Sequence, residues 1–192
     1  MNIFPTPIHM QMLEGIDNES LSEYAYSLKN SDSGARISNK GGWQSNTIPF
    51  NNVFNLMSEI MLHIKDYTSV LNIRKGCHIN FTNQWVNINN KHSYNVPHAH
   101  NGFISGVYYV NGLGVNHGKL LLHHSDKTKT LAWHQEWFED YNDVNCHTFE
   151  ITPKSGLLVL FPSWLEHSVD RNTLNEDRVS LSFNTEIKYA DY

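Results

Sequence analysis

Three histidines in this sequence have the type and spacing to bind one metal ion. His98 and His100 are one residue apart in the segment Pro-His-Ala-His, residues 97–100. In an extended segment, residues i and i+2 point to the same side, roughly 6.6 Å apart at about 3.3 Å per residue, so two imidazoles can converge. His167 follows an apolar strand at 156–161, and a turn there would let it reach the same site. Since neutral imidazole suits iron, zinc, copper and nickel, these three residues are the predicted ligands.

Spacing alone is weak evidence here, because twelve histidines can produce a His-x-His pair by chance. His123 and His124 illustrate the problem. Being adjacent, they face opposite sides of a strand, and we interpret them as structural or substrate-side residues. The prediction for His98 and His100 therefore depends on their surroundings.

A polar stripe on the last strand offers an anion-binding group. Alternation puts Arg178, Ser180, Ser182 and Asn184 on one face and Val179, Leu181 and Phe183 on the other. Such a face fits a wet cavity, where Arg178 can bind a carboxylate through two parallel hydrogen bonds and Ser180 can add a third. The alternative is a solvent-facing strand in which Arg178 pairs with Glu176 or Asp177 at the surface.

Tyr109 belongs to a predicted strand at 103–110 and shares a face with Ser105. Its hydroxyl can hydrogen-bond the same anion as Arg178. Alternatively, Tyr108 and Tyr109 are simply good strand formers that pack on the two faces.

The elements that must position these residues change from helical to β along the chain. Asn18 is the expected cap of a helix over 19–29. A second helix is predicted over 51–68, with an apolar stripe of Val53, Leu56, Met57, Ile60, Met61, Ile64 and Tyr67. From Lys75, a strand places Ile79, Phe81, Asn83, Trp85 and Asn87 on one face, and further strands are predicted at 103–110, 119–124, 148–152, 157–161 and 178–186. Residues 126–147 read as an aromatic-rich insertion that serves as a lid or substrate wall, or only packs over the sheet edge.

Helices followed by about eight short strands favour the α+β class. We predict a double-stranded β-helix (jelly roll, cupin-like) with N-terminal helices packed on one sheet. The expected organisation is one domain over 1–192, with helical support at 1–70 and a β core at 75–192.

The net charge, the apolar runs and the cysteine content argue against several other classes of protein. A net charge of −5 argues against an extended nucleic-acid contact, which needs a basic surface. The first twelve residues lack a signal-peptide pattern, and no apolar run approaches the roughly 20 residues of a membrane helix. Cys77 and Cys146 are expected to be free thiols. We therefore expect a cytoplasmic protein; the family resemblance described below implies that the cell is a bacterium or a phage host.

Taken in order, three segments resemble the 2-oxoglutarate- and Fe(II)-dependent oxygenases. They are residues 97–111 (PHAHNGFISGVYYVN), 153–167 (PKSGLLVLFPSWLEH) and 178–184 (RVSLSFN). That family carries His-x-Asp/Glu before a strand, then a distal His, then Arg-x-Ser. Residues 3–8 (IFPTPI), 42–45 (GWQS) and 105–109 (SGVYY) resemble a subgroup of small, uncharacterised oxygenases of marine bacteria and phages, so the resemblance covers nearly the whole chain.

This resemblance implies roles for particular residues. His98 matches the first histidine and His167 the distal one, while Arg178 and Ser180 match the pair that binds the 5-carboxylate of 2-oxoglutarate. Tyr109 matches a tyrosine that some members place on that carboxylate. His100 departs from the pattern, since it stands where the family has a carboxylate ligand.

The implied activity is hydroxylation of an unidentified substrate, with Fe(II) as cofactor, 2-oxoglutarate as co-substrate, and succinate and CO2 as products. A small-molecule or amino-acid-like substrate is expected, and a homodimer is compatible with the fold. Two alternatives remain open: a three-His dioxygenase that does not use 2-oxoglutarate, which His100 favours, and a non-catalytic metal-binding jelly-roll module.

Overall fold

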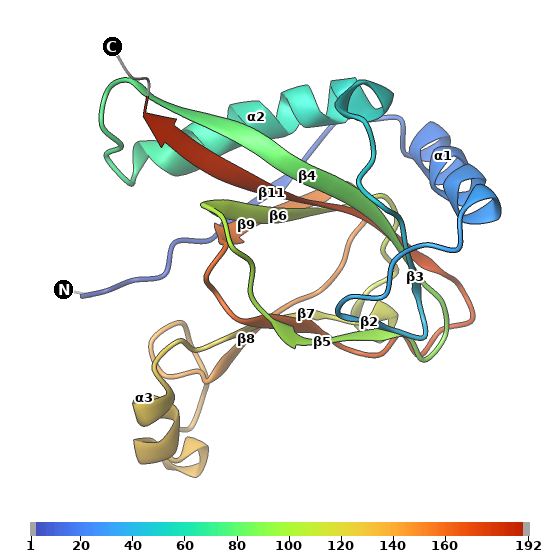
Figure 1. Ribbon diagram of the computed structural model, residues 1–192. Coiled ribbons are helices and arrows are strands. Elements are labelled where there is room, and N and C mark those ends of the chain that lie inside the picture. The colour runs from blue at the N-terminus through green and yellow to red at the C-terminus, as the bar shows by residue number, and fades with distance from the viewer. Residues whose placement is uncertain (1–2, 190–192) are drawn as a thin grey trace.

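The computed structural model describes residues 3–189 and shows two antiparallel sheets facing each other (Figure 1). One sheet has the order β1-β9-β6-β11-β4-β3 and the other β2-β5-β10-β7-β8. The strands are β1 (His9–Met12), β2 (Asn39–Lys40), β3 (Trp43–Gln44), β4 (Cys77–Asn89), β5 (Tyr94–His98), β6 (Ile104–Tyr109), β7 (Leu120–His123), β8 (Thr148–Ile151), β9 (Leu157–Pro162), β10 (His167–Val169) and β11 (Arg178–Tyr189). The predicted jelly roll with helices on one sheet is confirmed.

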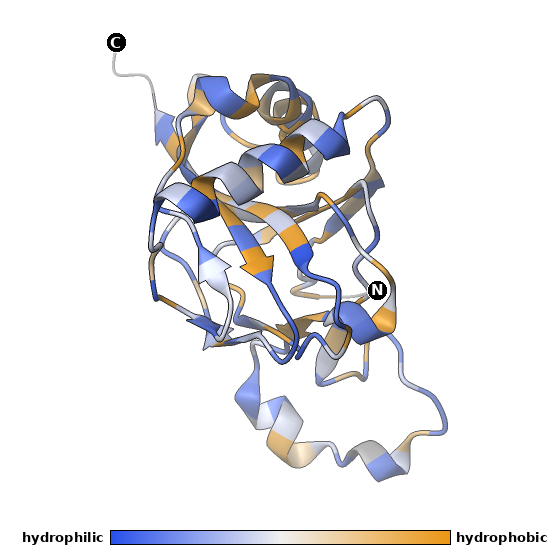
Figure 2. Cartoon of the chain, turned by 90° about the vertical axis from the view of Figure 1, so that its right-hand side faces the viewer, coloured by the Kyte–Doolittle hydropathy of each residue, from blue (hydrophilic) through white to orange (hydrophobic). Residues whose placement is uncertain are grey.

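Two long helices, α1 (Asn18–Ser31) and α2 (Phe54–Ser69), lie on the outer face of the six-stranded sheet (Figures 1 and 2). A 3-10 turn, η1 (Phe50–Val53), precedes α2. The predicted apolar stripe faces the sheet: all of its members are buried except Met61, which is partly buried. Each fully buried aliphatic side chain contributes about 1.5–3 kcal/mol, so this face holds α2 in place.

The cap of α1 is Asp17, so the prediction of Asn18 is wrong by one residue. The Asp17 carboxylate accepts a hydrogen bond from the Ser20 backbone N–H at 3.0 Å, which satisfies one of the unpaired donors of the first turn. Asn18 instead bonds outward: its side chain accepts from the Tyr108 hydroxyl at 2.8 Å and donates to the Ser155 hydroxyl at 3.2 Å. Asn18 therefore connects α1 to β6 and to the loop that precedes β9.

Strand β4 changes its faces part-way along. Its pairing with β11 shifts between Asn184 and Thr185, so that Thr82 is opposite no residue of β11 in the register and forms a β-bulge. Before the bulge, Ile79 and Phe81 pack on the helix-side core. After it, Trp85 and Asn87 line a cavity between the sheets. The predicted single face from Ile79 to Asn87 is therefore wrong for Ile79 and Phe81.

Two apolar cores separate the layers. The helix-side core includes Tyr108, Val179 and Leu181, while the inter-sheet core includes Tyr109 and Phe161. Thus the alternation predicted for the strands at 103–110 and 178–184 is confirmed, and it directs Tyr109 toward the space between the sheets.

The described residues contain eleven strands, more than the eight expected. The additional strands are short, and β2 and β3 have two residues each, which is too few for an alternation to be recognised. Residues 126–147 extend beyond the five-stranded sheet, on the side opposite to α1 and α2, and contain α3 (Lys127–Ala132) and η3 (Gln135–Trp137) (Figure 1). A further 3-10 turn, η2 (Val115–His117), precedes β7. No helix within residues 3–189 combines the length and apolar character of a membrane span.

Candidate metal centre

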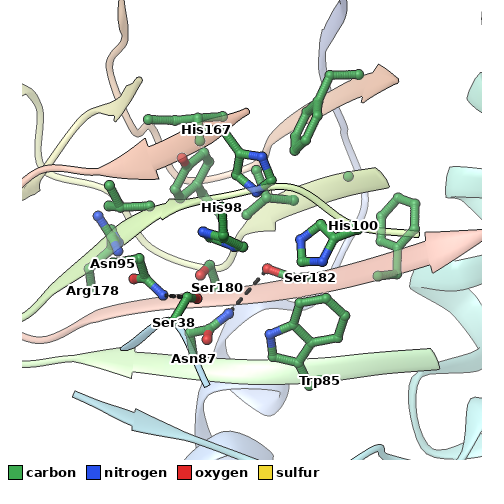
Figure 3. Close-up of a pocket in the computed structure, with 17 residues that line it drawn as sticks. Ser38, Trp85, Asn87, Asn95, His98, His100, His167, Arg178, Ser180 and Ser182 are labelled. Atoms are coloured by element: carbon green, nitrogen blue, oxygen red, sulfur yellow. Dashed lines mark hydrogen bonds between the residues drawn. The ribbon is translucent and has the colours of Figure 1, made fainter. Parts of the chain in front are cut away.

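The five-stranded sheet brings the three predicted histidines together (Figure 3). His98 ends β5 and His167 begins β10, and the two residues are direct partners in the antiparallel register. His100 lies two residues beyond β5, where its backbone N–H donates to the Ser163 carbonyl at 2.9 Å. The ring centroids are 4.3 Å apart for His98 and His167, 5.0 Å for His98 and His100, and 5.1 Å for His100 and His167. One nitrogen of each ring lies within 4.8 Å of the others, as a shared ion requires.

Backbone carbonyls fix the tautomer of two of these rings. The Nδ1 atom of His98 is 2.7 Å from the Val96 carbonyl, and that of His167 is 2.9 Å from the Leu165 carbonyl. Because a carbonyl only accepts, each Nδ1 carries the proton and each Nε2 presents its lone pair. The His100 ring is held differently, by an edge contact with Trp85 at a centroid distance of 5.9 Å.

Burial keeps the three rings neutral. It lowers the pKa of His98, and it lowers the pKa of His100 to about 4 and that of His167 to about 3, with neighbouring histidines adding to both shifts. Neutral imidazoles are the form that binds a metal ion. Among the described residues, no carboxylate joins this cluster.

Arg178 lies in the same cavity as the histidines and is 2% exposed. Its Nη1 donates to the carbonyls of His117 at 3.2 Å and Gly118 at 2.7 Å, while its buried Nε has no partner in the described chain. No carboxylate within residues 3–189 forms an ion pair with it, so the alternative of a surface salt bridge to Glu176 or Asp177 is wrong. A buried guanidinium without a counter-charge is costly, and an anionic ligand would offset that cost.

Ser180 and Tyr109 lie beside Arg178 on the cavity wall. They are direct partners in the register of β11 and β6, and both are buried. Burial raises the pKa of the Tyr109 hydroxyl, and the nearby Arg178 charge opposes this shift. Ser182 also lines the cavity. Asn184 does not; its side-chain oxygen accepts a hydrogen bond from the Ser105 hydroxyl at 2.7 Å.

The comparisons with known proteins place this site in a family. The family model described as "Putative 2OG-Fe(II) oxygenase" matches residues 83–184, a segment that contains His98, His100, His167 and Arg178. The chain belongs to this oxygenase family. Iron and 2-oxoglutarate are accordingly the cofactor and co-substrate of this class of enzyme. A comparison with curated proteins finds no significant match.

Solved structures of oxygenases share the fold of this family member. The α-ketoglutarate-dependent epimerase SnoN from nogalamycin biosynthesis is 12% identical, with a TM-score of 0.65 over 97% of this chain and 82% of that one. A prolyl-4-hydroxylase from Pseudomonas putida is 16% identical, with a TM-score of 0.59 over 97% and 94%. A prolyl hydroxylase from Trichoplax adhaerens, in complex with a peptide fragment, is 15% identical, with a TM-score of 0.63 over 97% and 84%. At these identities the likeness concerns the fold.

Several cavity residues of this oxygenase were not predicted from the sequence. Ser38, Trp85, Asn87 and Asn95 line the cavity and come from three separate segments. Asn95 donates to the Ser38 hydroxyl at 3.1 Å, and Asn87 donates to that of Ser182 at 3.1 Å (Figure 3). The only available signal was the alternation of β4, which places Trp85 and Asn87 on one face.

His123 and His124 do not line the cavity of this oxygenase. The His123 Nε2 lies 2.8 Å from the Ser168 hydroxyl, and the His124 Nε2 lies 3.1 Å from the Lys129 Nζ. These contacts join neighbouring segments, which agrees with the structural interpretation of the two residues.

Proposed function

We propose that His98, His100 and His167 hold Fe(II) in this chain, and that Arg178, Ser180 and Tyr109 bind the 5-carboxylate of 2-oxoglutarate. The proposed reaction is hydroxylation of a substrate C–H bond, with succinate and CO2 as the other products. The observation that carries the proposal is the buried Arg178, which has no carboxylate partner and shares one cavity with three neutral histidines.

The donor set fits the metal that the family uses. Imidazole nitrogen is a good ligand for iron, and the Nε2 atoms of His98 and His167 are already oriented by hydrogen bonds on the far side of each ring. When bound, Fe(II) supplies the activation of O2 that oxidises 2-oxoglutarate and substrate together. The protein positions both reactants and excludes water.

The anion site fits the distal end of a dicarboxylate. The Arg178 guanidinium keeps Nε free, so it can offer a charge-assisted hydrogen bond that is not already used by the backbone. The hydroxyls of Ser180 and Tyr109 lie on the same wall and can donate to the same carboxylate. Phe161, Leu120 and Val169 line the remaining surface and limit access of water.

His100 changes the charge balance of the site. Three neutral ligands leave the full double positive charge of Fe(II), whereas a carboxylate ligand would remove one unit. In our proposal the 5-carboxylate of 2-oxoglutarate pairs with Arg178, so only the 1-carboxylate would offset charge at the metal. That carboxylate would be the only anionic group on the ion, so we expect metal and co-substrate to bind with strong mutual dependence.

Succinate formation tests the proposal. The purified chain with Fe(II) and 2-oxoglutarate should form succinate, and a panel of small molecules, free amino acids and peptides should identify compounds that accelerate it. Stoichiometric hydroxylated product would support the proposal, while absence of succinate with every compound and of 2-oxoglutarate binding would contradict it.

The cluster of three histidines without a carboxylate favours one alternative, a dioxygenase that uses no oxoacid. Thermal unfolding with saturating Mn(II), with and without 2-oxoglutarate, separates the two. A further rise in Tm with 2-oxoglutarate supports our proposal, and no further rise supports the alternative.

Residues 126–147 are proposed to form part of the substrate wall. Lys127 pairs with Glu166 at 2.7 Å, which links this segment to the residue before the ligand His167. Trp137 and Tyr141 are exposed on it. Removing this link by Lys127→Ala should raise the KM for substrate and leave 2-oxoglutarate affinity unchanged.

A further inference from the structure

A second pair of histidines, His9 and His63, lies outside the oxygenase site. His9 begins β1 at the edge of the six-stranded sheet, and His63 lies on α2. The His9 Nε2 and the His63 Nδ1 are 3.3 Å apart, within hydrogen-bonding distance, and the ring centroids are 5.3 Å apart. The proposed oxygenase reaction makes no use of this pair.

The distance between the two nitrogens matches a shared metal ion. Zinc–imidazole bonds of about 2.0–2.1 Å in tetrahedral geometry place two ligand nitrogens about 3.3 Å apart. In the metal-free protein the same distance allows a hydrogen bond between the two rings. The pair therefore already has the spacing that a tetrahedral ion requires.

The surroundings of the pair resemble those of metal-bound imidazoles. The far nitrogen of His63, Nε2, lies 3.6 Å from the Glu59 carboxylate, one turn earlier on α2. This distance is too long for a hydrogen bond, but the carboxylate favours a proton on Nε2, which leaves Nδ1 to accept a metal ion. Burial and the neighbouring His63 lower the pKa of His9, while Asp66 raises it, so Asp66 acts on the same ring.

We propose that His9 Nε2 and His63 Nδ1 form a second metal site, which takes a divalent borderline cation such as Zn(II), with water in the remaining positions. Asp66 is exposed and follows His63 by three residues, so its negative charge lies on the same face of α2 and would favour a cation there. If Nδ1 of His63 carries the lone pair, His9 must move its proton from Nε2 to Nδ1 when the ion binds. This proton shift leaves the net charge of the protein ligands unchanged.

Such a site would fasten the N-terminal strand to the helix layer. Within residues 3–189, the other hydrogen bond near this pair joins the Tyr67 hydroxyl on α2 to the Pro7 carbonyl at 3.1 Å. A cation that binds only the folded chain raises its stability by mass action, so zinc should stabilise the docking of β1 on α2.

Zinc stoichiometry tests this inference independently of the oxygenase reaction. In equilibrium dialysis of the metal-free full chain against Zn(II), wild type should bind two equivalents, one at each site. His9→Gln and His63→Gln should each bind one equivalent, and the exposed control His78→Gln should bind two. The decisive quantity is the difference between variants: if His9→Gln and His63→Gln bind as many equivalents as wild type and His78→Gln, the inference is overturned, whatever the oxygenase site binds.

A second measurement uses the unaltered protein in case a variant folds poorly. During Zn(II) titration followed by NMR, the ring signals of His9 and His63 should shift together at the second equivalent. Ring signals that stay unchanged up to two equivalents would overturn the inference, whatever happens at His98, His100 and His167.

Discussion

Replacing Arg178 by alanine should weaken 2-oxoglutarate binding far more than metal binding. The guanidinium is buried, has no carboxylate partner in the described chain and lies next to Ser180 and Tyr109, so a carboxylate held there would lose its cationic partner in the cavity. Truncating one member of a buried, hydrogen-bonded charge pair costs about 2–5 kcal/mol. At about 1.4 kcal/mol per factor of ten, the Kd for 2-oxoglutarate should rise between about 30-fold and several thousand-fold.

Calorimetric titration of the anaerobic chain loaded with Mn(II) measures this change. Arg178 also donates to the carbonyls of His117 and Gly118, so the alanine variant loses local packing as well. Arg178→Lys keeps the charge and should lose less affinity than Arg178→Ala. Arg171→Ala is the matched control, since Arg171 is exposed and contacts only the Tyr94 ring among the interactions described, and it should bind normally.

The comparison of metal with co-substrate decides the interpretation. Mn(II) affinity measured without 2-oxoglutarate should change less than about threefold in Arg178→Ala, because Arg178 is not one of the three proposed ligands. A threefold change in Kd corresponds to less than about 1 kcal/mol of binding free energy. Equal losses of metal and 2-oxoglutarate affinity would show that Arg178 has a structural role, and unchanged 2-oxoglutarate affinity would refute the reasoning.

Four further predictions follow from the same site. His167→Ala should abolish stoichiometric metal binding while His78→Ala retains it, and metal retained by His167→Ala in elemental analysis would exclude that residue as a ligand. His100→Asp should still bind Mn(II), but the gain in Mn(II) affinity caused by 2-oxoglutarate, typically about 1–3 kcal/mol for coupled sites, should decrease; an unchanged gain would argue against our charge argument. Gly118→Ala should weaken 2-oxoglutarate binding, because Gly118 has φ +86° and an added Cβ would lie 2.8 Å from the Arg178 Nη1; normal binding would contradict this. Metal-free stability in urea should fall from about pH 6.5 downward, because unfolded histidine takes up a proton with a pKa near 6.5 whereas His167 does so only near a pKa of about 3; a flat profile from pH 7 to pH 4 would contradict the burial argument.

The sequence predicted the site residues better than it predicted the walls around them. Alternation in 178–184 placed Arg178 and Ser180 on the cavity face, because a regular strand directs every second side chain to one side. Residues of the site that come from short or irregular segments, such as Ser38 and Asn95, carry no such pattern. Their positions depend on tertiary pairing between distant strands.

Two wrong predictions have the same kind of cause. The β-bulge at Thr82 reversed the faces of Ile79 and Phe81, and no local signal in this stretch marks the unpaired residue. The cap of α1 fell on Asp17 because both Asp17 and Asn18 are good caps, and tertiary hydrogen bonds to Tyr108 and Ser155 engage Asn18. Local preference alone could not choose between them.

A crystal structure of the chain with Mn(II) and 2-oxoglutarate tests the central claim most directly. Our account predicts one ion bonded to His98, His100 and His167, with the 5-carboxylate of 2-oxoglutarate hydrogen-bonded to Arg178. An ion held without His167, or a 2-oxoglutarate molecule bound away from Arg178, would contradict it.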